Sequence, residues 1–157
     1  MEHVTIYTDG ACADNPRGNG GYGVVIVYGD HRQELAGGFR NTTNNRMEMY
    51  AAIAGLEALK EPAEVTIYSD SQYLVNSISK GWVYRWKKNN WMRNKQDPAL
   101  NVDLWERILA LYQIHNVTFQ WVRGHAGHPE NERCDALAVT ALKQPNLPID
   151  KLIEDLP

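Results

Sequence analysis

The pattern of hydrophobic and polar residues predicts alternating strands and helices along the whole chain. Residues 4–9 (VTIYTD) alternate β-branched with polar side chains up to the turn at Gly10, which is typical of a strand. The same pattern predicts strands over residues 20–28, 33–39, 65–70 and 117–122. Helical spacing predicts helices over residues 44–60, 71–79, 82–88, 102–115 and 129–143. We expect the first three strands to form an antiparallel meander, and the chain after Pro145 to be loosely packed.

Two of the predicted strands are nearly identical in sequence. Residues 4–9 are VTIYTD and residues 65–70 are VTIYSD, and each ends in an aspartate. The helix between the third and fourth strands allows a crossover, so the fourth strand can lie parallel to the first. Adjacent strands are about 4.8 Å apart, so Asp9 and Asp70 would lie side by side at the carboxyl edge of the sheet, where α/β sheets bind ligands. Because neighbouring carboxylates repel each other, this arrangement indicates a divalent cation.

Two further acids are candidates for the same site. Glu48 lies early in its helix on a line with Ala52 and Leu59, and Asp135 lies early in the last helix on a line with Ala138. Either acid could instead be a carboxylate that is favoured by the positive end of its helix. Four acids at one edge would form an all-oxygen site, which suits Mg²⁺ or Mn²⁺ better than zinc.

Length and composition narrow the class of protein. The chain has 157 residues, about one domain, and its 43% hydrophobic and 22% charged residues are ordinary for a globular protein. It contains neither an apolar run of about 18 residues nor a signal-peptide pattern at its start. Cys12 and Cys134 are the two cysteines, which excludes a disulfide scaffold and a four-cysteine zinc site. We therefore expect a cytoplasmic protein. We also expect it to be a monomer, a separate expectation that does not follow from the cysteine count.

The distribution of charge points to a polyanionic partner. Residues 80–96, which we call the basic segment, hold six of the sixteen Lys and Arg residues and none of the nineteen Asp and Glu residues. Such a segment on an acidic body is typical of a nucleic-acid footprint, although an exposed basic helix without a partner would have the same composition. Its tryptophans, Trp82, Trp86 and Trp91, could stack on bases or anchor the segment to the body.

Two other motifs match known binding patterns only in part. Residues 18–23 (GNGGYG) match a dinucleotide-binding pattern, but a strand follows them where that motif requires a helix. His125, His128 and Cys134 have a loosely zinc-like spacing, but there is no fourth soft ligand nearby.

Four motifs together resemble the type 1 ribonuclease H family. They are YTDGAC at residues 7–12, TNNRME at 43–48, SDSQY at 69–73 and GHAGHPENERCD at 124–135. The resemblance covers essentially the whole chain, is strongest to the bacterial ribonuclease HI members, and matches the basic segment to the family's protruding basic handle. It implies an α/β ribonuclease H-like fold, a five-stranded mixed sheet of order 3-2-1-4-5 flanked by helices. Residues 1–145 would be the single catalytic domain and residues 146–157 a C-terminal tail.

The resemblance also implies an activity and its chemistry. The family comprises metal-dependent endonucleases that hydrolyse the RNA strand of RNA–DNA hybrids and leave 5′-phosphate and 3′-hydroxyl ends. Asp9 would bridge two Mg²⁺ ions, for which Mn²⁺ is a possible substitute, with Asp135 on the ion that activates water. Glu48 and Asp70 would hold the ion that stabilises the leaving oxygen. His125 matches a histidine that carries a proton from the attacking water or helps the product leave.

Hybrid recognition requires reading the 2′-hydroxyls of one strand through the wide minor groove. The resemblance assigns substrate contacts to Cys12, Asn15, Arg40, Thr43, Asn44, Asn45, Gln72, Trp82, Lys87, Lys88 and Asn101. Thr43 and Asn101 would form the family's phosphate pocket for the DNA strand. The chain departs from the family pattern at Asn41, where bacterial relatives often carry arginine, and in the loop 14–20, which is one residue longer than usual.

Two rival functions share this pattern. A hybrid-binding module without catalysis would have lost at least one acid, whereas all four are present. A transposase- or integrase-like strand transferase would carry added DNA-binding domains, for which we expect 157 residues to leave no room. The four acids therefore favour the nuclease.

Overall fold

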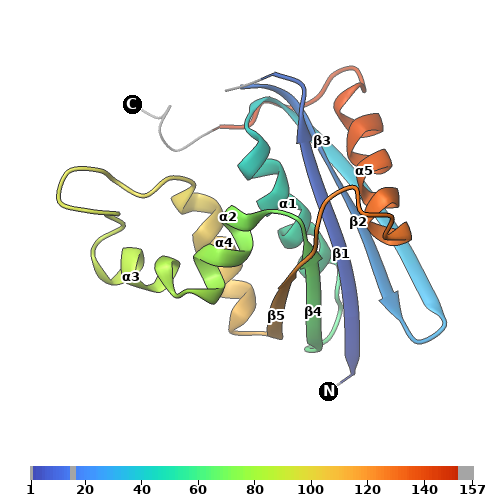
Figure 1. Ribbon diagram of the computed structural model, residues 1–157, viewed down its shortest axis with the longest axis horizontal. Helices are drawn as coiled ribbons and strands as arrows, with labels where there is room; N and C mark the ends of the chain where they lie inside the picture. Colours follow the sequence, from blue (N-terminus) through green and yellow to red (C-terminus); the bar gives the residue numbers. More distant parts are fainter. Residues whose placement is uncertain (1, 15–16, 152–157) are drawn as a thin grey trace.

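The computed structural model describes residues 2–14 and 17–151, and within them the strands form one mixed sheet. The strands are β1 (His3–Cys12), β2 (Gly18–Tyr28), β3 (His31–Thr42), β4 (Glu64–Ser69) and β5 (Asn116–Trp121). Their order in the sheet is β3-β2-β1-β4-β5, as shown in Figure 1. The first three strands pair antiparallel, while β4 lies parallel to both β1 and β5. The predicted fold class and strand order are therefore confirmed.

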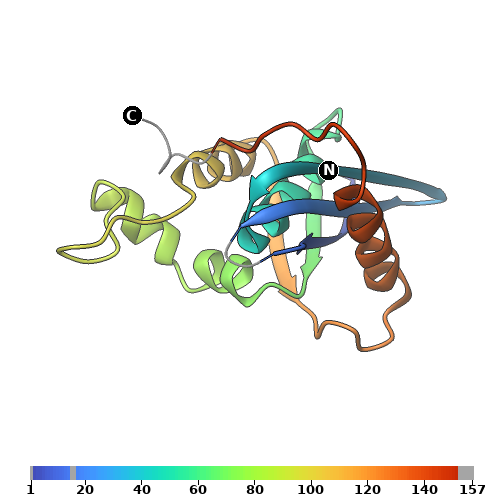
Figure 2. The same ribbon diagram turned by 90° about the horizontal axis from the view of Figure 1, so that it is seen from above.

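The helices form a layer on each face of the sheet. They are α1 (Asn44–Glu57), α2 (Gln72–Ser79), α3 (Trp82–Lys88), α4 (Val102–Tyr112) and α5 (Pro129–Leu142). Helix α1 packs on β1 and β2 with α4 beside it, and α5 covers the other face of β1, β2 and β3 (Figure 2). Helix α3 and the loop after it project from the body (Figure 1). Of the helices in the described ranges, none is both long enough and apolar enough to span a membrane.

The core lies between the sheet and α1. The side chains of Ile6, Val24 and Ile67 are fully buried there, together with Ile53 and Leu56 of α1. This burial explains the alternating pattern of the strands, because every second residue faces the helix. Burying side chains of this size contributes about 1.5–3 kcal/mol each.

The two similar hexapeptides lie side by side in register. Val4 pairs with Val65 and Ile6 with Ile67 in the parallel β1–β4 ladder. The next pair, Tyr7 and Tyr68, stacks with its ring centroids 5.2 Å apart. The aspartate that ends each hexapeptide therefore reaches the same edge of the sheet, as the sequence predicts.

The beginning of the C-terminal tail is packed, so the expected loose packing after Pro145 is wrong for residues 147–150. Leu147 is buried, and backbone hydrogen bonds join the tail to Arg40, whose N–H donates to the Pro148 carbonyl at 2.7 Å. The Asp150 N–H in turn donates to the Arg40 carbonyl at 2.9 Å. The tail packs because it extends the free edge of β3. Residues 152–157 lie outside the described part of the chain.

Candidate active site

Three of the four predicted acids meet at the carboxyl edge of the two central parallel strands. Asp9 lies on β1, Asp70 directly follows β4, and Glu48 lies in the second turn of α1. One oxygen from each carboxylate lies within 4.8 Å of the others. Asp9 and Glu48 are only 8% and 4% exposed, so the cluster is largely shielded from water.

The fourth acid faces this cluster across a narrow cleft. Asp135 lies in the second turn of α5, outside the three-acid cluster, and its charge contributes to raising the pKa of Asp9. The cleft is lined by Asp9, Asp70, Gly124, His125, Asn131, Glu132 and Asp135. Asn131 and Glu132 were not predicted as site residues. Their spacing of four and three residues before Asp135 puts them on the same helix face, a pattern that could have identified them.

The electrostatics of the cluster favour the binding of a cation. Burial, and then the charge of Asp70, raise the pKa of Asp9. Burial, and then the charges of Asp9 and Asp70, raise the pKa of Glu48 well above its usual range. Glu48 Oε1 is buried without a hydrogen-bond partner in the described structure, which is costly for a carboxylate. A divalent cation bound by these oxygens would offset the repulsion between the carboxylates and would give Glu48 Oε1 a partner. These residues therefore fit a site for a metal such as Mg²⁺.

His125 lies in an exposed loop at the rim of this cleft. Its backbone φ is +53°, in the left-handed region that non-glycine residues rarely adopt, and Gly127 follows at +81°. The two left-handed residues turn the loop so that His125 lines the cleft with Asp70 and Asp135. His128 occupies the N-cap position of α5, but its side chain makes no capping hydrogen bond.

Several predicted substrate-binding residues flank the acids. Asn44 and Asn45 are exposed in the first turn of α1, and Gln72 is exposed at the start of α2, two residues after Asp70. Cys12 ends β1, and its thiol donates to the carbonyls of Asp14 at 3.2 Å and Thr42 at 3.5 Å. Asn15 lies outside the described residues.

Thr43 and Asn101, the predicted phosphate pocket, lie on either side of Arg46. Thr43 caps α1 by accepting a hydrogen bond from the Arg46 N–H at 3.2 Å. Asn101 has a left-handed backbone at the N-cap of α4, and its Oδ1 accepts from Arg46 Nη1 at 3.4 Å. Arg40 is directed elsewhere, because its Nε donates to the Leu147 carbonyl at 2.7 Å.

Tryptophans anchor the basic segment to the body. The ring of Trp86 packs edge-on against buried Trp105, with centroids 6.4 Å apart. Trp91 donates through Nε1 to Glu106 at 2.9 Å. Of the two roles considered for these tryptophans, the structure therefore shows the anchoring role for Trp86 and Trp91.

The remaining predicted residues of the basic segment are Trp82, Lys87 and Lys88. Trp82 is half-buried beneath the Lys80 ammonium, which lies 5.5 Å from its ring centroid. Trp82 also lines a surface hollow of about 450 Å³ with Arg85, Trp86, Asn89, Met92 and Arg93. Lys87 and Lys88 are exposed, and Lys87 Nζ lies 3.6 Å from Glu106 Oε2, an exposed ion pair of little energetic weight.

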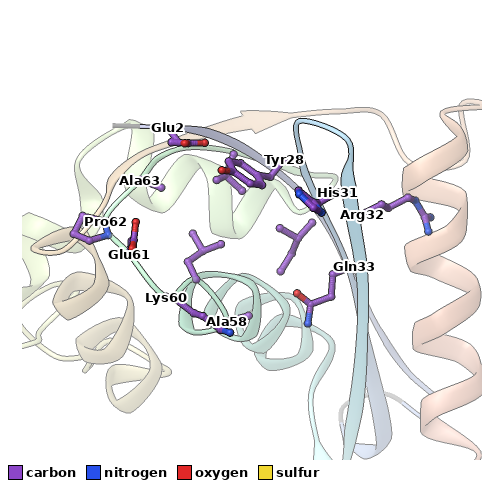
Figure 3. A pocket seen from close by; sticks show the side chains of 13 residues that line it. Glu2, Tyr28, His31, Arg32, Gln33, Ala58, Lys60, Glu61, Pro62 and Ala63 are labelled. Atoms are coloured by element: carbon purple, nitrogen blue, oxygen red, sulfur yellow. The ribbon is translucent and has the colours of Figure 1, made fainter.

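A separate cavity of about 570 Å³ lies at the opposite end of the sheet. Figure 3 shows it between the start of β1, the β2–β3 hairpin and the end of α1, with Tyr28, His31 and Lys60 among its lining residues. None of the four acids lines it. The candidate chemistry therefore lies in the small cleft rather than in the larger cavity.

A mixed sheet of this order, with clustered carboxylates at the carboxyl ends of its central parallel strands, defines a metal-dependent nuclease of the ribonuclease H-like fold. The RNase H family model matches residues 1–143. The chain therefore belongs to the ribonuclease H family.

Curated relatives agree with this assignment. The chain is 65% identical to the ribonuclease H of Desulforamulus reducens over 150 residues, which cover 96% of this chain and 94% of the relative. It is 58% identical to the ribonuclease HI of Synechocystis sp. over 146 residues, covering 92% and 91% of the two chains.

Solved structures show the same fold. LC9-RNase H1, described as a type 1 RNase H with the type 2 active-site motif, superposes with a TM-score of 0.78 at 32% identity. The match covers 90% of this chain and 72% of LC9-RNase H1. LC11-RNase H1, whose structure is a complex with an RNA/DNA hybrid, has a TM-score of 0.67 at 24% identity over 88% and 96% of the chains, a likeness of fold alone.

Proposed function

We propose that this chain is an endonuclease that hydrolyses the RNA strand of RNA–DNA hybrids with two Mg²⁺ ions and leaves 5′-phosphate and 3′-hydroxyl ends. Its membership of the ribonuclease H family makes it a nuclease that acts on RNA in such hybrids. The observation that carries the chemical proposal is the cluster of buried Asp9 and Glu48 with half-buried Asp70, in which one oxygen of each lies within 4.8 Å of the others.

The carboxylates have distinct places in the proposed metal centre. Asp9 belongs to the cluster with Glu48 and Asp70 and also lines the cleft with Asp135. We assign Asp9 to both ions, as the family resemblance implies. Two divalent ions, with Mn²⁺ as a possible substitute for Mg²⁺, supply charge stabilisation to the attacking and leaving oxygens when bound. A protein nucleophile is then unnecessary.

His125 and Asp135 belong to the cleft side of the centre. Both line the cleft, and His125 is exposed on a turn between Gly124 and Gly127. An imidazole in that position can accept a proton at a ring nitrogen and release it to solvent. We assign His125 this transfer of protons and Asp135 the completion of the ligand set.

The hybrid would lie across the acids and the basic segment. LC11-RNase H1, which shares the fold, is described in complex with an RNA/DNA hybrid. Exposed Asn44, Asn45 and Gln72 beside the acids can hydrogen-bond in the minor groove, where 2′-hydroxyls distinguish RNA from DNA. Exposed Lys87 and Lys88 can neutralise phosphates, the main source of affinity for nucleic acids. We also assign the remaining predicted contacts, Cys12, Asn15, Thr43, Trp82 and Asn101, to the hybrid. Arg40 would join them only on releasing the Leu147 carbonyl that it holds in this structure.

The location and organisation of the chain are part of the proposal. Cys12 and Cys134 are free thiols, which the reducing cytoplasm favours. We propose a cytoplasmic monomer whose residues 1–145 form the catalytic domain, followed by a C-terminal tail whose residues 147–150 pack against it. Sedimentation analysis of the purified protein checks the monomeric state.

The function is tested by a cleavage assay on labelled RNA–DNA, RNA–RNA and DNA–DNA duplexes with a Mg²⁺ titration. We expect metal-dependent cutting of RNA in the hybrid alone, with 5′-phosphate products. Binding of the hybrid without cutting would instead support the binding module, and joined DNA strands would support the strand transferase. Either result would overturn the proposal.

A further inference from the structure

Gly10 lies where α1 packs against β1, next to Asp9. Gly10 follows Asp9, and a Cβ added to Gly10 would lie 2.5 Å from the backbone nitrogen of Glu48 and 2.6 Å from the carbonyl carbon of Met47. Real Cβ atoms essentially never come within 3.0 Å of such atoms. Any side chain at Gly10 would therefore push the start of α1, and Glu48 with it, away from Asp9.

A second glycine stands where α5 approaches the sheet. Gly23 is the partner of Asp9 in the antiparallel β1–β2 ladder. A Cβ added to Gly23 would overlap the carbonyl oxygen of Cys134, the residue that precedes Asp135. The absence of a side chain at Gly23 therefore lets α5 bring Asp135 down towards Asp9.

A third glycine faces the carboxylate of Asp70. A Cβ added to Gly124 would lie 2.6 Å from Asp70 Oδ2, and its next nearest atoms, Cβ and Cγ of Asp70, would be 3.5 Å away. The added methyl group would thus overlap with the Asp70 carboxylate and make no closer than ordinary contacts with other atoms. Because a carboxylate at the end of a side chain can rotate, Asp70 would turn away from Gly124 at little cost to the fold.

We infer that Gly10, Gly23 and Gly124 are positioning residues that set the separations of the four carboxylates. Each leaves empty the space that one neighbouring element needs: α1 with Glu48, α5 with Asp135, and the Asp70 side chain itself. Carboxylates so close together repel each other unless a cation lies between them. The close approach therefore favours metal binding but lowers the stability of the metal-free protein. This inference rests on the proposed metal site, whose ligands it does not change.

Gly124→Ala gives the decisive test, because its only steric conflict is with a rotatable carboxylate. We would titrate the purified, substrate-free protein with Mn²⁺ by calorimetry and measure its urea midpoint separately. We expect the affinity for Mn²⁺ to fall roughly 10-fold, as on loss of a group that orients a ligand, while the urea midpoint stays at the wild-type value. In an Asp70→Ala background, Gly124→Ala should change neither quantity.

Gly38→Ala is the matched control. Its Cβ would lie 2.5 Å from the Gly20 carbonyl oxygen, a comparable overlap with no acid among the nearest atoms. We expect a lower urea midpoint and wild-type Mn²⁺ affinity for Gly38→Ala. Gly10→Ala and Gly23→Ala meet backbone, so they should lower both the midpoint and the Mn²⁺ affinity.

Two outcomes would overturn the inference while leaving the metal site standing, and a third would overturn both. If the wild type binds Mn²⁺ and Gly124→Ala binds it equally well, Gly124 does not position Asp70. If Gly124→Ala weakens binding as much in the Asp70→Ala background, its effect does not pass through Asp70. Absence of Mn²⁺ binding by the wild type would overturn the proposed metal site, and the inference with it.

Discussion

Asp150 accepts a hydrogen bond from Arg46 Nε at 2.7 Å, although 104 residues separate the two along the chain. Both side chains are only 1% exposed. The same guanidinium donates to Asp103 of α4 at 2.7 Å. One buried arginine therefore joins α1, α4 and the C-terminal tail, and it also hydrogen-bonds to Thr43 and Asn101.

Removing the charge of Asp150 should destabilise the fold. Asp150→Asn weakens a buried charged pair while Arg46 keeps Asp103 as a partner, so we expect the free energy of unfolding to fall by about 2–3 kcal/mol. Glu57→Gln is the matched control, because its pair with Arg107 is exposed and contributes below about 1 kcal/mol. Urea denaturation measures both variants, and equal losses would show that burial of the Arg46 pair is energetically unimportant.

Asp9→Asn should abolish most of the activity while preserving binding. The substitution keeps the shape of Asp9 but removes the charge shared by the proposed metals, so hybrid cleavage should fall by several orders of magnitude. Binding of the hybrid should survive, because phosphate contacts supply most of its affinity. Asp30→Asn, in the exposed β2–β3 turn, is the control and should cleave at the wild-type rate. A rate for Asp9→Asn above about a tenth of wild type would contradict the two-metal assignment.

Replacing Lys87 and Lys88 by alanine should weaken the salt dependence of hybrid binding. Each phosphate contact contributes about one unit to the slope of log affinity against log salt, so the slope should become shallower by roughly 1–2 units. KM should rise more than kcat falls. A double alanine variant at Lys60 and Lys143, outside the basic segment, should keep the wild-type slope. An unchanged slope in the Lys87 and Lys88 variant would indicate an exposed basic helix without a partner.

His125→Ala should lower kcat by an amount near the bottom of the roughly 10²–10⁴-fold range of acid–base groups, because water can partly replace an imidazole. KM should hardly change. His128→Ala is the control, since its exposed side chain makes no capping bond and should be dispensable for the rate. Steady-state kinetics over a range of hybrid concentrations, at saturating Mg²⁺, measure both kcat and KM. Nearly full kcat in His125→Ala would exclude the proton-transfer role.

His115 should make stability depend on pH. Burial lowers the pKa of His115 below its ordinary value of 6.5, and its Nδ1 accepts a hydrogen bond from the Ala63 N–H at 3.1 Å. The unfolded chain therefore binds this proton more readily than the folded chain does. The stabilisation is fully present above about pH 6.5 and is lost as the pH falls towards the lowered pKa.

His115→Asn tests this dependence, because an asparagine oxygen can accept the same hydrogen bond without titrating. Urea midpoints at about pH 7.5 and about pH 5 should differ less for the variant than for the wild type. The same difference in both proteins would assign the pH dependence to other groups.

The sequence alone determined the order and type of the elements, because their signals are local. The residues of 4–9 and 65–70 alternate with period two, and this pattern, with the crossover rule, was enough to predict that Asp9 and Asp70 share one edge. Helical spacing made Glu48 and Asp135 candidates for the same site, and the structure places Glu48 in the cluster and Asp135 beside it. Each of these patterns, the strand alternation and the helical spacing, can be recognised within one short segment of the chain.

Features that depend on contacts between distant segments are visible only in the tertiary structure. Arg46 is polar and lies in a helix, so no local pattern predicts that it is fully buried; its burial requires Asp103 and Asp150 from elsewhere in the chain. The same pairing fixes Asp150 of the tail against α1. Likewise, Gly124 matters to Asp70 only once β5 and β4 lie side by side. Such contacts depend on which surfaces meet after folding, and periodicity along the chain carries no information about them.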